Sequence, residues 1–155
     1  MGMVGLIRAI SEEQAGQVQR GEADSWELLD ADESEYLDKA WHGLHFLLCG
    51  DAWGAVGVLG EALMGGASIG EDGGYGPARY LDPQRAAAVH AALSAVDVDE
   101  LREAFDPEAF QAAEVYPQIW DEEDAVDYPL GYLEAVRGVY AAAAEAGHGV
   151  LIGIT

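Results

Sequence analysis

The two ends of the sequence constrain the fold most, because both have the character of short apolar strands. Residues 3–10, MVGLIRAI, are apolar and rich in β-branched side chains, and residues 149–155, GVLIGIT, have the same character. Strands this short are not stable alone and need neighbours in a sheet. We therefore expect the two ends to share one sheet, although most of the chain separates them.

The segments between these strands have the patterns of amphipathic helices. Ser11 and Gln14 form a capping box, and Asp82-Pro83 and Asp106-Pro107 each place an N-cap acceptor before a proline at the first helical position. Strands and helices do not alternate as repeated βαβ units, so the sequence predicts an α+β fold in a single domain over residues 1–155. That fold would have one small sheet that includes the N- and C-terminal strands and is covered by several amphipathic helices. The main helices are expected over residues 12–20, 37–49, 83–96, 99–105, 107–113 and 130–146, with a short helix before the glycine-rich stretch near residue 70.

The charge of the chain limits its partners. It has 29 acidic and 7 basic residues among 155, a formal net charge of -22, while half of its residues are hydrophobic, which favours a folded domain. Nucleic acids are bound mainly by Lys and Arg, so a nucleic-acid partner is not expected. An acidic surface instead attracts basic protein partners.

The sequence also indicates a location. Cys49 is the sole cysteine, which excludes an internal disulfide and fits a reducing compartment. The first residues do not form a signal peptide, and no apolar run reaches the length of a membrane span. We expect a cytoplasmic protein with no membrane association.

The helix expected over residues 37–49 carries a polar stripe beside its apolar one. Asp38, His42, His45 and Cys49 follow at spacings of four, three and four. At 1.5 Å of rise per residue the stripe is roughly 16 Å long, so at most the two histidines and one outer residue could reach one ion. We interpret the stripe as an Asp38–His42 pair, a hydrogen-bonded His45 at the core edge and a small buried Cys49, and expect neither a metal nor a cofactor.

No catalytic set is evident. Lys39, the sole lysine, is interpreted as a surface helix charge or a partner for a nearby acid. Ser68 lacks a GxSxG context, and Cys49 at a helix C-terminus would have its thiolate disfavoured by the helix dipole. The acidic run at residues 121–124 indicates a solvated face or a weak cation surface. The sequence therefore favours a protein that is not an enzyme.

The stretch GEDGGYGPARYL, residues 70–81, allows two interpretations. It lacks the lysine motif of a phosphate-binding loop, its two acids would repel phosphate, and Pro77 has no amide to donate. One interpretation is a tight loop that turns Tyr75 inward and places Arg79 in an internal ion pair. The other is a pocket in which Arg79 binds a small anionic ligand, with Tyr75 and His45 along its wall.

Three blocks of the sequence together resemble the YfbM-like family of small bacterial proteins. They are MGMVG at residues 1–5, DKAWHGLH at residues 38–45 with the Leu48 and Gly50 that follow, and GYGPAR at residues 74–79. The EVYP stretch at residues 114–117 also fits the pattern. The resemblance covers nearly the whole chain and implies a single-domain α+β fold, an unassigned function and no catalytic residue. The residues that match its pattern are Asp38, Lys39, Trp41, Leu44, His45, Tyr75 and Arg79.

Two functional hypotheses follow. The first is an acidic binding or interaction module without catalysis, whose partner is a basic protein. The second is a small-molecule-binding protein or enzyme with a pocket of Tyr75, Arg79 and His45, and with Trp41 as a wall. The candidate ligand-binding residues are Lys39, Trp41, His45, Tyr75 and Arg79.

Overall fold

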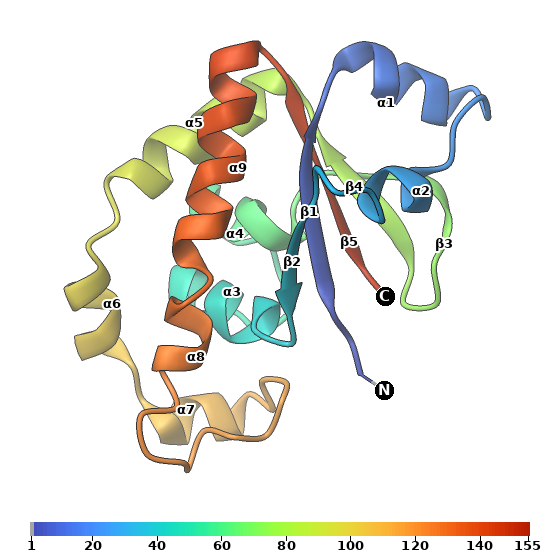
Figure 1. The fold of residues 1–155 in the computed structure, drawn as a ribbon. Helices are drawn as coiled ribbons and strands as arrows, with labels where there is room; N and C mark the ends of the chain where they lie inside the picture. Colours follow the sequence, from blue (N-terminus) through green and yellow to red (C-terminus); the bar gives the residue numbers. More distant parts are fainter. Residues whose placement is uncertain (1) are drawn as a thin grey trace.

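The computed structural model describes residues 2–155 and has a five-stranded antiparallel sheet with helices on both faces (Figure 1). The strand order is β2-β1-β5-β4-β3, so the first and last strands are neighbours. Gly5 pairs with Ile154 and Ile10 with Gly149, which confirms that the two chain ends share one sheet and that the fold is α+β. The strands are β1 (Gly5–Ile10), β2 (Glu35–Asp38), β3 (Ala67–Asp72), β4 (Pro77–Leu81) and β5 (Gly149–Ile154).

Helices of unequal number cover the two faces. The α5 and α9 helices pack on one face together with α3 and α4, and α1 and α2 lie on the other (Figure 1). The helices are α1 (Glu12–Gln19), α2 (Ser25–Leu29), α3 (Trp41–Cys49), α4 (Gly57–Met64), α5 (Pro83–Ser94), α6 (Val98–Ala104), α7 (Pro107–Ala112), α8 (Asp127–Leu130) and α9 (Leu133–Ala146).

Local sequence signals account for most helix starts. Ser11 and Gln14 make both hydrogen bonds of a capping box at α1. Asp82 and Asp106 accept backbone N–H groups at the starts of α5 and α7, each followed by proline. The apolar side of α9 is buried as its spacing predicts, and Gly147, with φ of 68°, ends that helix.

The core is divided by the sheet. A large cluster lies under α3, α4, α5 and α9, and it includes Ile7 and Ile152 from the central strands. A smaller cluster lies under α1 and α2 around Leu29 and Leu151. Alternate residues of β1 and β5 therefore belong to different cores, as strand pleating requires.

Two sequence predictions about these elements are wrong. The helix expected over residues 37–49 begins only at Trp41, because residues 35–38 form β2 and Asp38 turns the chain with φ of 50°. Leu37 is buried in the same core as the helix, so its spacing to Trp41 resembled a helical repeat. The glycine-rich stretch is also not one loop: it contains the end of β3, a turn at residues 73–76 and all of β4.

Candidate functional site

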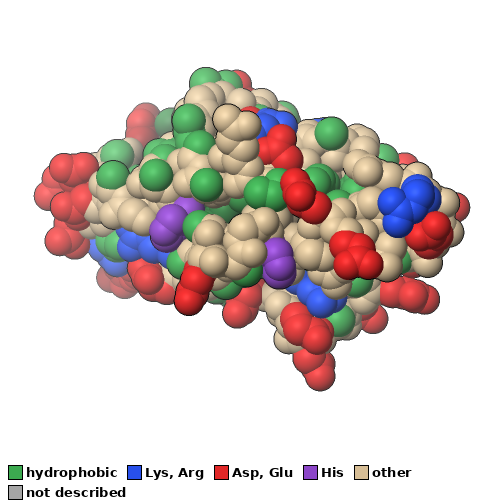
Figure 2. Space-filling view, turned by 90° about the horizontal axis from the view of Figure 1, so that it is seen from above, with side chains coloured by type: hydrophobic (Ala, Val, Ile, Leu, Met, Phe, Trp, Pro, Cys, Tyr) green, Lys and Arg blue, Asp and Glu red, His purple; other side chains and the backbone are tan. Residues whose placement is uncertain are grey.

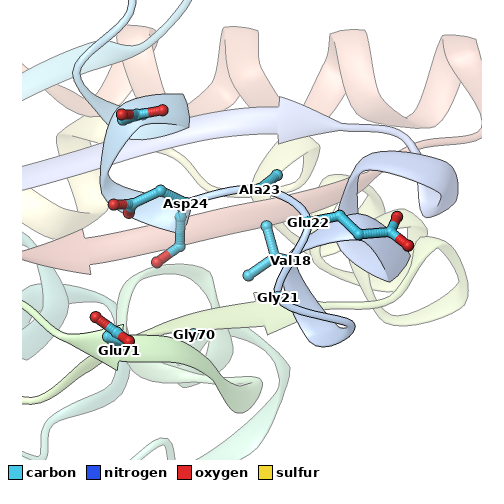
Figure 3. Close-up of a pocket in the computed structure, with 9 residues that line it drawn as sticks. Val18, Gly21, Glu22, Ala23, Asp24, Gly70 and Glu71 are labelled. Carbon is cyan, nitrogen blue, oxygen red and sulfur yellow. The ribbon is translucent and has the colours of Figure 1, made fainter.

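An acidic cavity lies between the α1–α2 connection and β3. It has a volume of about 350 Å³ and opens beside α2. Gly21, with φ of 75°, reverses the chain after α1, and the N-cap Asp24 then starts α2. Figure 3 shows Glu22 and Asp24 on this connection and Glu71 on the strand across from it. Glu27 on α2 adds a fourth carboxylate to the lining.

A second cavity of about 440 Å³ adjoins the first and shares Asp24 and Glu27 with it. Asp30 lines its far side, and the half-buried Trp26 forms its wall. We call the two cavities the acidic groove, with carboxylates from Glu22, Asp24, Glu27, Asp30 and Glu71. All five of these residues are exposed, so they can meet a partner directly.

The Trp26 ring is fixed by its surroundings. Its Nε1 donates a hydrogen bond to the Glu71 carbonyl oxygen at 2.9 Å. A Cβ at Gly153 would lie 2.6 Å from the ring, and a Cβ at Gly73 would collide with it. Glycine at these two positions therefore gives the indole room to lie flat against the sheet.

Ser25 is an unusual part of the groove wall. The residue is 1% exposed, and its hydroxyl has no hydrogen-bond partner among residues 2–155. Ser25 lines the cavity, and a Cβ at Gly70 would lie 2.7 Å from that hydroxyl oxygen, so the oxygen is covered by its neighbours and leaves no room for a side chain at residue 70. A buried hydroxyl without a partner costs about 1–3 kcal/mol, which a donor entering the groove would recover.

Two basic side chains lie near the groove. Arg20 pairs with Glu22 at 3.1 Å on the surface, and Arg8 donates a hydrogen bond to the Leu28 carbonyl oxygen at 2.8 Å. Five carboxylates thus face two guanidinium groups, and the groove keeps a negative field. Acidic side chains also predominate over basic ones in the space-filling view (Figure 2).

The opposite face of the sheet has a smaller cavity, which we call the aromatic pocket. Its volume is about 180 Å³, and Trp53, Tyr75 and Arg79 line it over a floor of apolar side chains from α4 and β5. The structure therefore brings two of the predicted site residues, Tyr75 and Arg79, into one cavity. The other three do not line it.

The conformations of Tyr75 and Arg79 differ from the tight-loop interpretation. Tyr75 is 58% exposed at the hairpin turn and does not point inward. Arg79 is exposed and donates a hydrogen bond to the Gly66 carbonyl oxygen at 3.3 Å. No carboxylate of residues 2–155 lies within 4.0 Å of its guanidinium, so the internal ion pair is absent. Because residues 77–81 form a strand, alternate side chains point to opposite faces, and Arg79 faces the pocket side.

His45 and Trp41 lie in the core behind the aromatic pocket. His45, predicted at the core edge, is fully buried, and its Nε2 donates to the Gly54 carbonyl oxygen at 2.9 Å, which is the predicted hydrogen bonding of this ring. The Trp41 Nε1 donates to the Met3 carbonyl oxygen at 2.9 Å, and its ring stacks on His42. Burial lowers the pKa of both histidines, so both are neutral near pH 7.

The polar stripe predicted on one helix is divided between two elements. Asp38 is on β2 and accepts a hydrogen bond from the Tyr128 hydroxyl at 2.9 Å, so the predicted Asp38–His42 pair does not form. His42 instead donates from Nε2 to the Ala52 carbonyl oxygen and accepts the Tyr116 N–H at Nδ1. Cys49 is half-buried, and its sulfur lies 3.4 Å from His45 Nε2. No cluster of three potential metal ligands occurs within residues 2–155.

Lys39 lines a third cavity, to which none of the other four predicted site residues contributes. It follows β2 in a turn, so it is not the helix residue that the sequence predicted. The cavity has a volume of about 520 Å³, and the acidic run at residues 122–124 lines it together with Tyr128. Lys39 has no ion pair within the described chain.

No residue of the acidic groove was among the predicted site residues, and in the aromatic pocket neither was Trp53. Trp53 is 57% exposed, yet its ring lies 4.3 Å from the His42 ring. Asp51 Oδ1 accepts the Trp53 and Gly54 N–H groups, and these bonds lower the pKa of the Asp51 carboxyl. The DxWG spacing after the helix-ending Gly50 is the signal for this turn.

Comparison with known proteins assigns a family and confirms the fold. The model of DUF1877, a domain of unknown function, matches residues 1–153, and the chain belongs to this family. The crystal structure of YfbM from Escherichia coli, a protein of unknown function, is similar with a TM-score of 0.78 at 24% sequence identity, over 98% of this chain and 99% of that chain. These findings confirm the predicted YfbM-like family. No curated protein matches the chain. None of the helices within residues 2–155 has the length and apolar character needed to cross a bilayer.

Proposed function

We propose that the protein is a soluble cytoplasmic binding module that takes up a Lys- or Arg-containing segment of a protein partner in its acidic groove, without catalysis. One observation carries the proposal: exposed carboxylates from α2, its preceding connection and β3 surround a cavity whose wall holds the unpartnered hydroxyl of Ser25. The carboxylates explain attraction to a basic segment. The hydroxyl is an unused acceptor in the cavity wall, which an N–H donor of that segment would reach by a small displacement of the wall.

The chemistry of the groove suits guanidinium and ammonium groups. Asp24 and Glu27 belong to both cavities, so a cation between them would interact with two carboxylates. The fixed Trp26 ring beside them offers an aromatic face, which attracts cations by about 0.5–1 kcal/mol at exposed sites. A segment with two basic side chains could thus occupy both cavities at once.

A charge-matched pair of double variants tests the proposal. Asp24→Asn with Glu27→Gln removes two groove charges and keeps the N-cap of α2, because Asn caps as well as Asp. Glu103→Gln with Glu108→Gln removes two exposed charges on α6 and α7 and serves as the control. Binding of an Arg-Gly repeat peptide is measured by calorimetry at low and at physiological salt.

The groove variant should bind the peptide about 2- to 30-fold more weakly, because each of the two exposed charge contacts is worth about 0.2–1 kcal/mol. The control should bind like the unmodified protein, and added salt should weaken both. Equal losses in the two variants would mean that the overall charge attracts the peptide, which would refute a specific groove. Turnover of any substrate by the purified protein would refute a module without catalysis.

A further inference from the structure

The aromatic pocket combines an arginine and two aromatic side chains that the binding of a basic segment does not use. It lies on the face of the sheet opposite the acidic groove, since Gly153 contacts Trp26 while its strand neighbours Ile152 and Ile154 line the pocket. A ligand here would therefore bind independently of the groove.

Arg79 and Arg8 are the two arginines without an ion pair among residues 2–155, and only Arg79 is exposed. Arg20, Arg85, Arg102 and Arg137 each form an ion pair with a carboxylate. Arg79 has none within residues 2–155, although the chain has 29 acidic residues, and one hydrogen bond to a carbonyl oxygen uses one of its five N–H donors. The remaining donors can form the two parallel hydrogen bonds that a carboxylate accepts.

Hydrogen bonds hold the turns that carry both aromatic residues, although more than half of each side chain is exposed. The backbone of Trp53 is fixed by Asp51, and its ring contacts His42 on one side. Tyr75 lies in a hairpin turn in which Asp72 Oδ1 accepts the N–H groups of Gly74 and Gly76 at 2.7 and 3.2 Å. The loss of conformational entropy on binding is therefore reduced, which favours ligand binding at such aromatic surfaces.

The size of the pocket limits the ligand. Its 180 Å³ is below the range of about 300–1,000 Å³ for pockets that hold drug-sized ligands. The floor is apolar, from Leu63, Met64 and Ile152, and suits a single ring. We propose that the aromatic pocket binds a free single-ring aromatic carboxylate, with the carboxylate on the Arg79 guanidinium and the ring against Trp53 and Tyr75.

Benzoate is the probe for this proposal. It is titrated into isotope-labelled protein while the tryptophan indole and backbone amide signals are followed by NMR, with the Trp53 indole assigned from a Trp53→Phe variant. We expect saturable shifts at Trp53, Tyr75 and Arg79, with a dissociation constant of about 1 mM for so small a ligand. Benzamide, without the charge, and cyclohexanecarboxylate, without the aromatic ring, should each bind about fivefold or more weakly.

The variants separate the roles of the side chains. Arg79→Gln should weaken benzoate binding about tenfold or more, and Arg79→Lys should weaken it less because it keeps the charge but loses the planar fork. Tyr75→Phe should keep the affinity within about twofold, whereas Tyr75→Ala should lower it about threefold or more. Arg20→Gln changes the charge equally on the opposite face and should have no effect.

Absence of shifts at these residues up to about 20 mM benzoate would overturn the proposal. So would an unchanged affinity in Arg79→Gln, or equal binding of benzoate and cyclohexanecarboxylate. Arg-Gly peptide binding is tested by calorimetry with variants on the opposite face of the sheet, so none of these three results decides the proposed function of the acidic groove.

Discussion

The acidic groove and the aromatic pocket lie on opposite faces of the same strands and have opposite chemistry. Each has one fixed tryptophan, Trp26 or Trp53, beside a strand of the sheet. The groove surrounds its tryptophan with carboxylates, while the pocket places Arg79 near its own. A strand can serve both because successive side chains point to opposite faces. A net charge of -22 thus leaves room for a local site of the other sign.

Leu29→Ala should lower the stability of the protein more than the changes that follow, because it weakens the packing of α2 against the sheet. Leu29 is fully buried, and a Cβ at Gly153 would lie 2.5 Å from its Cδ1, so the two are in close contact. The void left by the shortened side chain should lower the free energy of unfolding by about 2–5 kcal/mol. Urea unfolding measures this loss, and peptide binding should weaken under conditions where the variant is folded.

The same variant tests whether the two faces are independent. Benzoate shifts at Trp53 should persist in folded Leu29→Ala, because the pocket takes no residue from α2. Loss of both activities in the folded variant would show that the sheet transmits the change between its faces.

A smaller effect is expected from Gly73→Ala. The added methyl group would collide with the Trp26 ring, and overpacking of this kind costs about 1–3 kcal/mol. Trp26 fluorescence and peptide affinity should both change. Gly138→Ala is the matched control: it lies exposed on α9 with open space around its Cβ, and should stabilise the protein by about 0.5–1 kcal/mol. Equal destabilisation by both alanines would contradict a specific contact with Trp26.

The smallest change concerns the pH dependence of the free energy of unfolding. Burial lowers the pKa of His42 and His45 below the ordinary value of 6.5, so the folded protein binds fewer protons than the unfolded chain as the pH falls through this range. The stability that depends on these two histidines being neutral is therefore fully present above about pH 7 and declines as the pH falls below about 6.5. Urea unfolding at several pH values measures the slope, which should be shallower in His42→Gln. No histidine lines the acidic groove. A slope unchanged by His42→Gln would mean that the acid sensitivity of stability comes from groups other than His42.

Features fixed by neighbouring residues were predictable from the sequence. The capping box at Ser11, the Asp-Pro starts of α5 and α7, and the apolar stripe of α9 act within one or two helical turns, and the structure has all of them. The pairing of the terminal strands was also predictable, because apolar strands need partners.

Features decided by residues distant in the sequence were not predictable from it. Leu37 has the right spacing for a helix with Trp41, but pairing with β1 makes its segment a strand. Tyr75 and Arg79 were predicted as a pair, and they share a cavity, yet the residue that completes their pocket is Trp53 and not His45. Two residues between the α3 and α4 helices account for this difference: Asp51 holds the turn that carries Trp53, and the Gly54 carbonyl oxygen accepts a hydrogen bond from His45 Nε2.

The position of β5 has a consequence for how the chain folds. It is the last strand of the chain, yet it lies at the centre of the sheet between β1 and β4. Until residues 149–154 have been synthesised, β1–β2 and β3–β4 are two separate pairs with no shared strand. The five-stranded sheet therefore cannot form while the ribosome is still making α9. Contacts between residues this distant in sequence favour slow folding. During that interval the apolar edges of both pairs are open to other chains, and a large negative charge is one means of keeping those chains apart.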